Sequence, residues 1–325
     1  MNKRDTWKNI FFFGAVLVLV LVLLISGLQI LGSTVFHNSQ TPDATIASKT
    51  VERDGKKYYP RQDITILLIM GIDEFGPVQE NTMLHTAGAA DMVTLAIFDE
   101  TNQETRLLVL NRDTMVRMPV LGLGGKPAGT YFGQLALSHT FGSGLEDSCE
   151  NTRNTVSNLL YGISIDHYLA MNMDAIVLLN DAIGGVTVQV TEDFSDIDPT
   201  ITMGEVTLMG QQAINFVRTR KGVADQLNIS RMERHKQYME GFMQALYGHK
   251  DDGSFLLNTF DQVADYIVTD CSTTVMSDMM QRYGAYPIVE IISPKGENVM
   301  DTYYQFHLDM DALDELILRL FYAEK

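Results

Sequence analysis

The chain has 325 residues, of which 46% are hydrophobic, and it carries a formal net charge of -17. This acidic balance argues against a nucleic-acid-binding protein, because phosphate backbones are bound by basic surfaces. The sequence is long enough for one large domain with a hydrophobic core, and no internal repeat indicates a second one.

The first element is an apolar segment, residues 10–31, without a charged side chain. It is long enough to cross the ~30 Å hydrocarbon core of a bilayer as one helix. Lys3, Arg4 and Lys8 precede it and acidic sequence follows, so the positive-inside rule places residues 1–9 in the cytoplasm. A cleaved signal peptide is the alternative, but the apolar run is longer than usual and no A-x-A site follows. We therefore expect a single-pass membrane protein with an extracytoplasmic C-terminal domain.

Residues 32–62 are polar, without a sustained hydrophobic period, and predict a stalk between the bilayer and the domain. From residue 63 to residue 325 the sequence has the alternating apolar and polar segments of a globular domain. Short apolar runs predict strands at 65–71, 92–98, 105–110, 168–172, 186–190 and 287–293. Amphipathic patterns predict helices at 151–160, 174–183, 208–217, 230–247, 255–267, 274–283 and 309–321.

Two features of this order indicate the fold class. The polar segment 99–103 is short enough to join the second and third strands as a hairpin, and helices alternate with strands from residue 151 onward. We therefore predict a three-layer α/β/α domain, with helices on both faces of a mixed β-sheet.

Polar residues follow or begin three of the predicted strands: Asp73, Asp91, and Arg112 with Asp113. Functional groups gather at strand ends in such sheets, and two carboxylates beside a pyrophosphate would supply the oxygen ligands of Mg²⁺. In the competing interpretation, the aspartates form turns or cap helices and Arg112 and Asp113 are a surface pair. The spacing of His85, His139 and His167 does not indicate a zinc site.

A cluster of basic residues stands out in this acidic chain, since six of its 24 Lys and Arg residues lie between Arg218 and Lys236. Arg218 and Arg220 would share one side of an extended backbone. Arg231 and Arg234 would lie near the N-terminus of the helix 230–247, where free N–H groups and the helix dipole also favour anions. The cluster therefore predicts a phosphate or pyrophosphate site. A solvated basic face, with Asp225 and Glu233 as partners, is the alternative.

Two cysteines, Cys149 and Cys271, fall in the predicted extracytoplasmic part. An even number of cysteines in an oxidising compartment favours a disulfide. We expect this pair to form one, and two buried thiols that never meet are the alternative.

Taken in order, several segments resemble the LytR-CpsA-Psr family. They are LLIMGID (67–73), ADM (90–92), NRDT (111–114), GISIDHY (162–168), DAIGGV (181–186), FVRTRK (216–221) and RMER (231–234). The resemblance covers most of residues 63–245, and the ordered set is far more specific than any one segment.

This resemblance implies a transferase that moves an anionic glycopolymer, such as teichoic acid or capsule, from a polyprenyl-pyrophosphate carrier to a peptidoglycan hydroxyl. In the family pattern, Asp73 and Asp91 fall on carboxylates that hold Mg²⁺ or Mn²⁺. Arg112 falls on the arginine that acts at the transferred phosphate, and Asp113 orients it. The pyrophosphate would be held by Arg218, Arg220, Arg231 and Arg234.

The sequence also departs from the family pattern. Ala89 replaces a basic residue, Asn111 replaces a proline, Asn228 replaces an aspartate, and His235 replaces a glutamine. Ala89 and Asn228 favour the alternative function, a non-catalytic receptor or scaffold that binds polyprenyl phosphates. A transcriptional regulator is the weakest option, because the cytoplasmic segment is too short to bind DNA.

Overall fold

The computed structural model describes residues 50–324, except for residues 54, 82, 84, 123–124, 220–233, 235–236, 239, 243, 246–254, 256–258, 260–261, 273–274, 276–277, 280–281 and 284–285. Within this part of the chain, no helix is long and apolar enough to cross a membrane. The apolar segment 10–31 lies outside the described residues, so the predicted anchor stays a prediction.

A six-stranded sheet forms the centre of the molecule, in the order β11-β8-β3-β4-β5-β12. Its strands are β3 (Ile64–Ile72), β4 (Ala90–Asp99), β5 (Glu104–Leu110), β8 (His167–Asn172), β11 (Ile267–Thr269) and β12 (Ile288–Ile292). β3 is parallel to β8 and antiparallel to β4, while β5 is antiparallel to β4 and parallel to β12. The predicted mixed sheet and the predicted β4–β5 hairpin are thus confirmed.

The sequence of β3 shows why this sheet lies in the interior. Its residues from Ile66 to Ile72 are all buried, so the run is continuously apolar instead of alternating. Leu67 and Ile69 belong to one core cluster, whereas Leu68 and Met70 belong to a second cluster. The two clusters lie on opposite faces of the sheet because successive side chains of a strand point to opposite faces.

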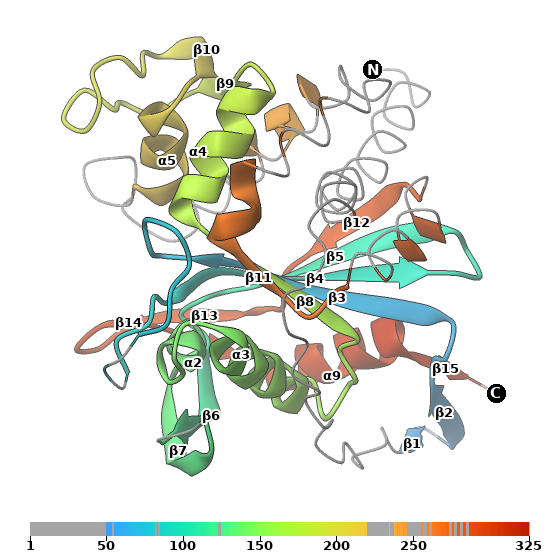
Figure 1. Cartoon of the computed structure of the whole chain (residues 1–325). Helices are drawn as coiled ribbons and strands as arrows, with labels where there is room; N and C mark the ends of the chain where they lie inside the picture. Colours follow the sequence, from blue (N-terminus) through green and yellow to red (C-terminus); the bar gives the residue numbers. More distant parts are fainter. Residues whose placement is uncertain are drawn as a thin grey trace.

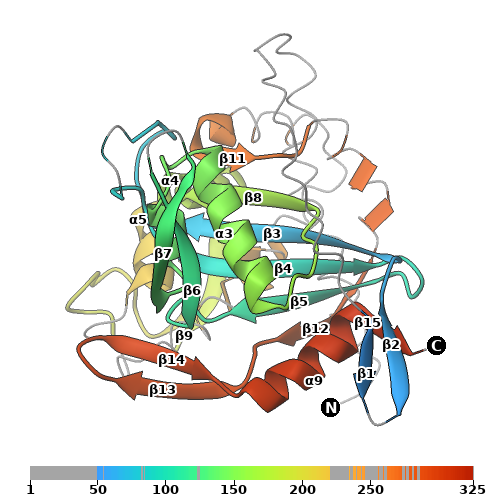
Figure 2. The ribbon, with the colours of Figure 1, turned by 90° about the horizontal axis from the view of Figure 1, so that it is seen from below.

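Helices cover both faces, as predicted (Figures 1 and 2). On one side lie α4 (Met173–Ala182) and α5 (Gln211–Arg218), with the hairpin of β9 (Val186–Val190) and β10 (Gly204–Leu208). On the other side lie α2 (Leu137–Thr140), α3 (Glu146–Leu159) and α9 (Met310–Phe321). Leu179 of α4 packs in the first cluster, and Val156 of α3 and Ile317 of α9 pack in the second.

Besides the β9–β10 hairpin, the described residues form three further small sheets outside the centre. β6 (Met115–Leu121) pairs with β7 (Pro127–Gln134), and β13 (Gly296–Met300) pairs with β14 (Tyr304–Leu308). β1 (Val51–Arg53), β2 (Lys56–Pro60) and β15 (Tyr322–Glu324) form the third sheet, seen at one end of the molecule in Figure 2. The folded part of the chain therefore begins at least 12 residues before residue 63, where the stalk was predicted to end.

Several predicted boundaries differ from the structure. The helix predicted at 151–160 begins at Glu146, and the helix predicted at 208–217 begins at Gln211 because Leu208 is the last residue of β10. The helix predicted at 255–267 extends too far, since Ile267 opens the edge strand β11. Of the helix predicted at 230–247, the described residues are helical.

The predicted disulfide is wrong, since Cys149 and Cys271 are both free and both buried. Cys149 packs in the cluster under α3, whereas Cys271 packs in the cluster on the other face of the sheet. Burial raises the pKa of the Cys149 thiol well above its ordinary value, so this sulfur stays protonated.

Candidate active site

The strand directions bring three polar segments to one end of the central sheet. β3, β5 and β8 end there, and β4, which runs the opposite way, begins there. Asp73 follows β3, Asp91 is the second residue of β4, and Arg112 and Asp113 follow β5. The sheet thus assembles the carboxylates and the arginine that the sequence predicted from separate segments.

A β-bulge sets the position of Asp91. Gly71 pairs with Met92 and Ile72 pairs with Ala90, so Asp91 is the extra residue between these two pairs. Beyond the bulge, the Asp73 N–H donates a hydrogen bond of 2.8 Å to the carbonyl of Ala89. A bulge bends the strand locally and changes the direction of its side chains, which accounts for the position of Asp91 at this end of the sheet. Because Ala89 acts here through its backbone, this contact does not depend on its side chain.

Arg112 lies between two carboxylates. Its Nη1 forms an ion pair with Asp91, and its Nε lies 3.5 Å from Oδ1 of Asp113. Nε is shielded from solvent and donates no hydrogen bond to the described residues. The guanidinium is therefore oriented by protein carboxylates on two sides.

The turn that carries Arg112 is fixed by hydrogen bonds from its neighbours. Oδ1 of Asn111 accepts from the Asp113 N–H at 3.0 Å, and the Thr114 hydroxyl donates to the Asn111 carbonyl at 2.6 Å. Oδ1 of Asp113 also accepts from Nε2 of Gln134 at 2.9 Å. Asp113 is 2% exposed, so protein donors and not bulk water hold its carboxylate. The orienting role of Asp113 stays a prediction.

Gln134 is a site residue that the sequence did not indicate. It ends β7, and its amide also donates to the Tyr304 carbonyl at 2.8 Å. The Phe306 N–H of β14 donates to the Asp113 carbonyl at 2.8 Å. The β6–β7 hairpin, which follows the Arg112 turn in sequence, and the distant β13–β14 hairpin thus both support this turn, and no local motif marks such contacts.

Arg218 is the last residue of α5 and is exposed. Its Nη2 lies 2.8 Å from Oδ1 of Asp73, and its guanidinium carbon lies 5.4 Å from the centre of the Phe75 ring. An arginine over an aromatic face gains a cation–π attraction of about 0.5–1 kcal/mol at exposed sites. Arg218 is therefore brought to the same sheet edge as Asp73, in a place where a ligand can reach it.

Arg234 has a different environment from Arg218. It is 6% exposed, and its Nε donates to the Phe216 carbonyl at 2.9 Å. Its other nitrogens donate to the Thr219 carbonyl and to the Glu192 carboxylate. Carbonyls at a helix C-terminus lack partners within the helix, and Arg234 satisfies them at the end of α5.

The other two arginines predicted to hold pyrophosphate, Arg220 and Arg231, lie outside the described residues, as do Asn228 and His235. The predicted extended backbone of the Arg218 segment begins only at Thr219, since Arg218 is helical. That Arg218 and Arg220 lie on the same side of the backbone thus stays a prediction.

A buried histidine lies behind the loop that follows β3. His139 of α2 has Nδ1 2.7 Å from the carbonyl of Gly88, which precedes Asp91 by three residues. Burial lowers the pKa of His139 to about 4, although the Gly88 carbonyl acts in the opposite direction. The imidazole is therefore neutral at pH 7, and Nδ1 donates its hydrogen to Gly88.

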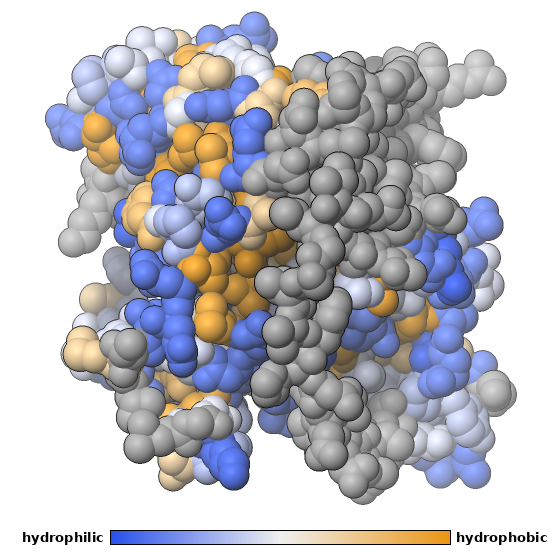
Figure 3. Space-filling view, in the orientation of Figure 1, coloured by the Kyte–Doolittle hydropathy of each residue, from blue (hydrophilic) through white to orange (hydrophobic). Residues whose placement is uncertain are grey.

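Apolar side chains gather on the surface below α4 and α5, beside hydrophilic residues (Figure 3). The loop after β3 contributes Phe75 and Pro77, which are exposed, and Val78, which is half-buried. A small pocket between this loop and the end of β8 is lined in part by Ile72, Val78 and Met171. The charged site thus borders apolar surface.

Comparison with known proteins agrees with the resemblance of the sequence motifs. The model of the LytR_cpsA_psr family matches residues 33–321. A protein of Enterococcus faecalis is 28% identical over 282 residues, which are 85% of this chain and 84% of that protein, and it is named polyisoprenyl-teichoic acid–peptidoglycan teichoic acid transferase TagU. The protein of the same name from Bacillus subtilis is 24% identical and covers 93% of this chain and 94% of its own length. Among solved structures, protein gbs0355 from Streptococcus agalactiae has a TM-score of 0.65 at 20% identity, covering 79% of this chain and 86% of its own.

Proposed function

Since the chain belongs to the LytR-CpsA-Psr family, we propose that it transfers an anionic glycopolymer from a polyprenyl-pyrophosphate carrier to a hydroxyl of peptidoglycan. The names of its relatives in Enterococcus faecalis and Bacillus subtilis support a teichoic acid as the polymer. One observation carries the proposal: Arg112 is oriented by Asp91 and Asp113 at the sheet edge where Arg218 pairs with Asp73.

In this reaction the acceptor hydroxyl attacks the phosphorus that bears the glycan. A new P–O bond to peptidoglycan forms, the bond between the two phosphates breaks, polyprenyl phosphate leaves, and the hydroxyl proton is released. Such transfers need positioned positive charge more than covalent help from the protein. Arg112 would bind the transferred phosphate and stabilise the charge that develops there. Arg218, with Arg220 and Arg231, would hold the carrier phosphate.

Asp73 and Asp91 fit the carboxylate ligands of Mg²⁺ or Mn²⁺. Oδ1 of Asp73 is shielded from solvent, and Arg218 approaches it at an angle that makes an ion pair without a hydrogen bond. If a bound phosphate took Arg112 from Asp91 and Arg218 from Asp73, both carboxylates would need another cation to offset their charge. A metal ion held there would neutralise pyrophosphate oxygens, which accords with its preference for one or two carboxylates plus phosphate and water.

We also propose that the protein is anchored in the cell membrane by residues 10–31, with the transferase domain outside the cytoplasm. The uncharged length of this segment and the basic residues before it support that orientation. The apolar surface beside Arg218 would then receive the first units of the polyprenyl chain as it emerges from the bilayer.

The test is a transfer assay with the full chain in detergent, Mg²⁺, a synthetic polyprenyl-pyrophosphate glycan and peptidoglycan oligomers. We expect glycan phosphate on the oligomers, with kcat lowered at least ~100-fold in Arg112→Ala, since charge stabilisation at the phosphate is lost. Arg319→Ala is a matched control, because Arg319 also pairs with a carboxylate, Glu290, but lies on the surface of α9.

The two candidate functions separate in the same experiment. Tight binding of the lipid pyrophosphate without any product would identify a receptor, the function that Ala89 and Asn228 favour. Wild-type turnover in Arg112→Ala would remove Arg112 from the mechanism and leave the transferase assignment without its central residue.

A further inference from the structure

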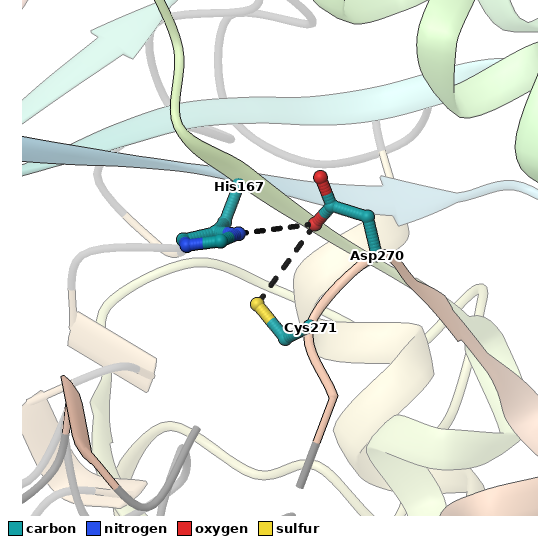
Figure 4. Close-up of side chains that lie close together, drawn as sticks. All are labelled: His167, Asp270 and Cys271. Atoms are coloured by element: carbon teal, nitrogen blue, oxygen red, sulfur yellow. Dashed lines mark hydrogen bonds and ion pairs between the residues drawn. The ribbon is translucent and has the colours of Figure 1, made fainter. Parts of the chain in front are cut away.

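A second group of chemically active side chains lies at the opposite end of the central sheet from Arg112. His167 is the first residue of β8, whose other end meets the transferase site. Asp270 and Cys271 follow the edge strand β11, which is antiparallel to β8 and pairs Thr269 with Leu169. The two strands thus bring the three side chains together, as Figure 4 shows.

The contacts within this group are a long ion pair and a weak thiol hydrogen bond. Nδ1 of His167 lies 3.6 Å from Oδ1 of Asp270, and Sγ of Cys271 lies 3.9 Å from the same oxygen. The three candidate ligand atoms all lie within 4.8 Å of one another. Metal–ligand bonds of about 2.0–2.3 Å in a tetrahedral site place the ligand atoms roughly 3.3–3.8 Å apart. The observed spacing is close to that of a tetrahedral metal site and leaves room for an ion.

His167 adds a second observation. Its Nδ1 is shielded from solvent and makes no hydrogen bond to the described residues, and its contact with Asp270 is a long ion pair of 3.6 Å. Such a ring nitrogen pairs with the carboxylate when it is protonated and is able to bind a metal ion when it is neutral. A metal ion bound to Nδ1 would replace this long contact with a coordinate bond.

The surroundings hold the carboxylate of Asp270 in place. Oδ1 accepts from the Tyr168 N–H at 2.8 Å, and Oδ2 accepts from Nη1 of Arg153 at 3.1 Å. The charge of Arg153 is in turn offset by its ion pair with Glu150. Carboxylates that bind metals are commonly oriented by such hydrogen bonds. The side chains of His167 and Asp270 are 26% and 23% exposed, so water can reach a fourth position.

We propose that His167, Asp270 and Cys271 bind one divalent ion of the zinc class and thereby fasten the edge strand β11 to β8. A thiolate with an imidazole selects zinc or cobalt over magnesium, which prefers oxygen ligands alone. The site is therefore separate from Asp73 and Asp91 and independent of the transferase reaction. His167 lies more than 100 residues from Asp270 in sequence, which explains why spacing in the sequence does not reveal the site.

The proposal is tested with the reduced full chain in detergent, stripped of metals and then titrated with Co²⁺ in the presence of excess Mg²⁺. We expect a sulfur-to-cobalt charge-transfer absorption that saturates at one equivalent and is displaced by Zn²⁺. Cys271→Ser should abolish the band, and His167→Gln should weaken Zn²⁺ binding about 100-fold or more, since a ligand is lost. Cys149→Ser is the matched control and should retain the band, because Cys149 contacts His139 on the other face of the sheet.

The wild-type spectrum decides the question even if a variant fails to fold. Absence of the cobalt–sulfur band at saturating Co²⁺ would overturn the proposal, and it would show that His167 and Asp270 form an ion pair without a metal. A band that disappears in Cys149→Ser and persists in Cys271→Ser would also overturn it.

Discussion

Asn111 shows how a single residue can fix the turn that carries the central arginine. Its side-chain oxygen accepts the Asp113 N–H, a bond that a proline at this position cannot make. A proline would fix its own φ angle instead. The departure from the family pattern thus replaces backbone restriction with a side-chain hydrogen bond at the same turn.

Gln134 gives a prediction at the same scale. In Gln134→Ala the Asp113 carboxylate loses a donor, so Arg112 should be held less firmly. We expect kcat to fall ~10-fold to ~100-fold with unchanged affinity for the lipid donor, because positioning and not ground-state binding is lost. Thr130→Ala, on the exposed part of the same strand β7, is the control. Equal losses in both variants would instead indicate that the hairpin matters only for folding.

At the scale of elements, α5 depends on a partner from a distant helix. Arg234 satisfies the carbonyls of Phe216 and Thr219 and pairs with Glu192, which lies 42 residues away. This arrangement holds the helix end from which Arg218 reaches the site. Arg234 is thus best described as a positioning residue for Arg218.

The prediction for this element concerns stability and binding together. Arg234→Met should lower the free energy of unfolding by roughly 3–5 kcal/mol, since Glu192 and two carbonyls lose their partner. Lipid-pyrophosphate affinity should also fall, because Arg218 is less well placed. Urea unfolding and donor binding measure the two effects. Glu192→Leu combined with Arg234→Met should recover part of the stability, and no change in either quantity would contradict the role.

The sequence predicted the central strands well because a buried strand is a largely apolar run, as β3 and the inner part of β4 show. It did not predict β7, in which six consecutive residues are exposed and no hydrophobic pattern is present. The sheet edge with Asp73, Asp91 and Arg112 was predictable from polar residues at strand ends. The sequence did not reveal on which face of the sheet each cysteine packs, nor which groups accept hydrogen bonds from Arg234. Both depend on contacts between segments distant in sequence.

At the scale of the whole molecule, buried titratable groups make stability depend on pH. The folded pKa of His139 is about 4, below the ordinary value of 6.5, so the unfolded chain binds the extra proton first. This contribution to stability is complete above pH 6.5 and is lost as the pH falls toward 4. Asp99 contributes to stability down to a lower pH. Burial would raise the pKa of its carboxyl, but hydrogen bonds from Arg61 and Asn102 outweigh this effect and hold the pKa at about 2.

We expect the free energy of unfolding to drop between pH 7 and pH 5 by roughly 2 kcal/mol more in the wild type than in His139→Gln, whose side chain does not titrate. Urea unfolding of both proteins at the two pH values measures this difference. An equal drop in the two proteins would show that His139 is not the group responsible.

The small sheet at one end of the molecule joins the beginning of the folded chain to its end. β15 pairs with β2 from Tyr322 to Glu324, and Glu324 forms an ion pair with Lys56 at 3.0 Å. A chain is synthesised from its N-terminus, and β15 begins more than 260 residues after the end of β2, so β2 lacks this partner until residue 324 has been made. This sheet is therefore completed late in synthesis, and a product truncated before β15 lacks the strand that completes it.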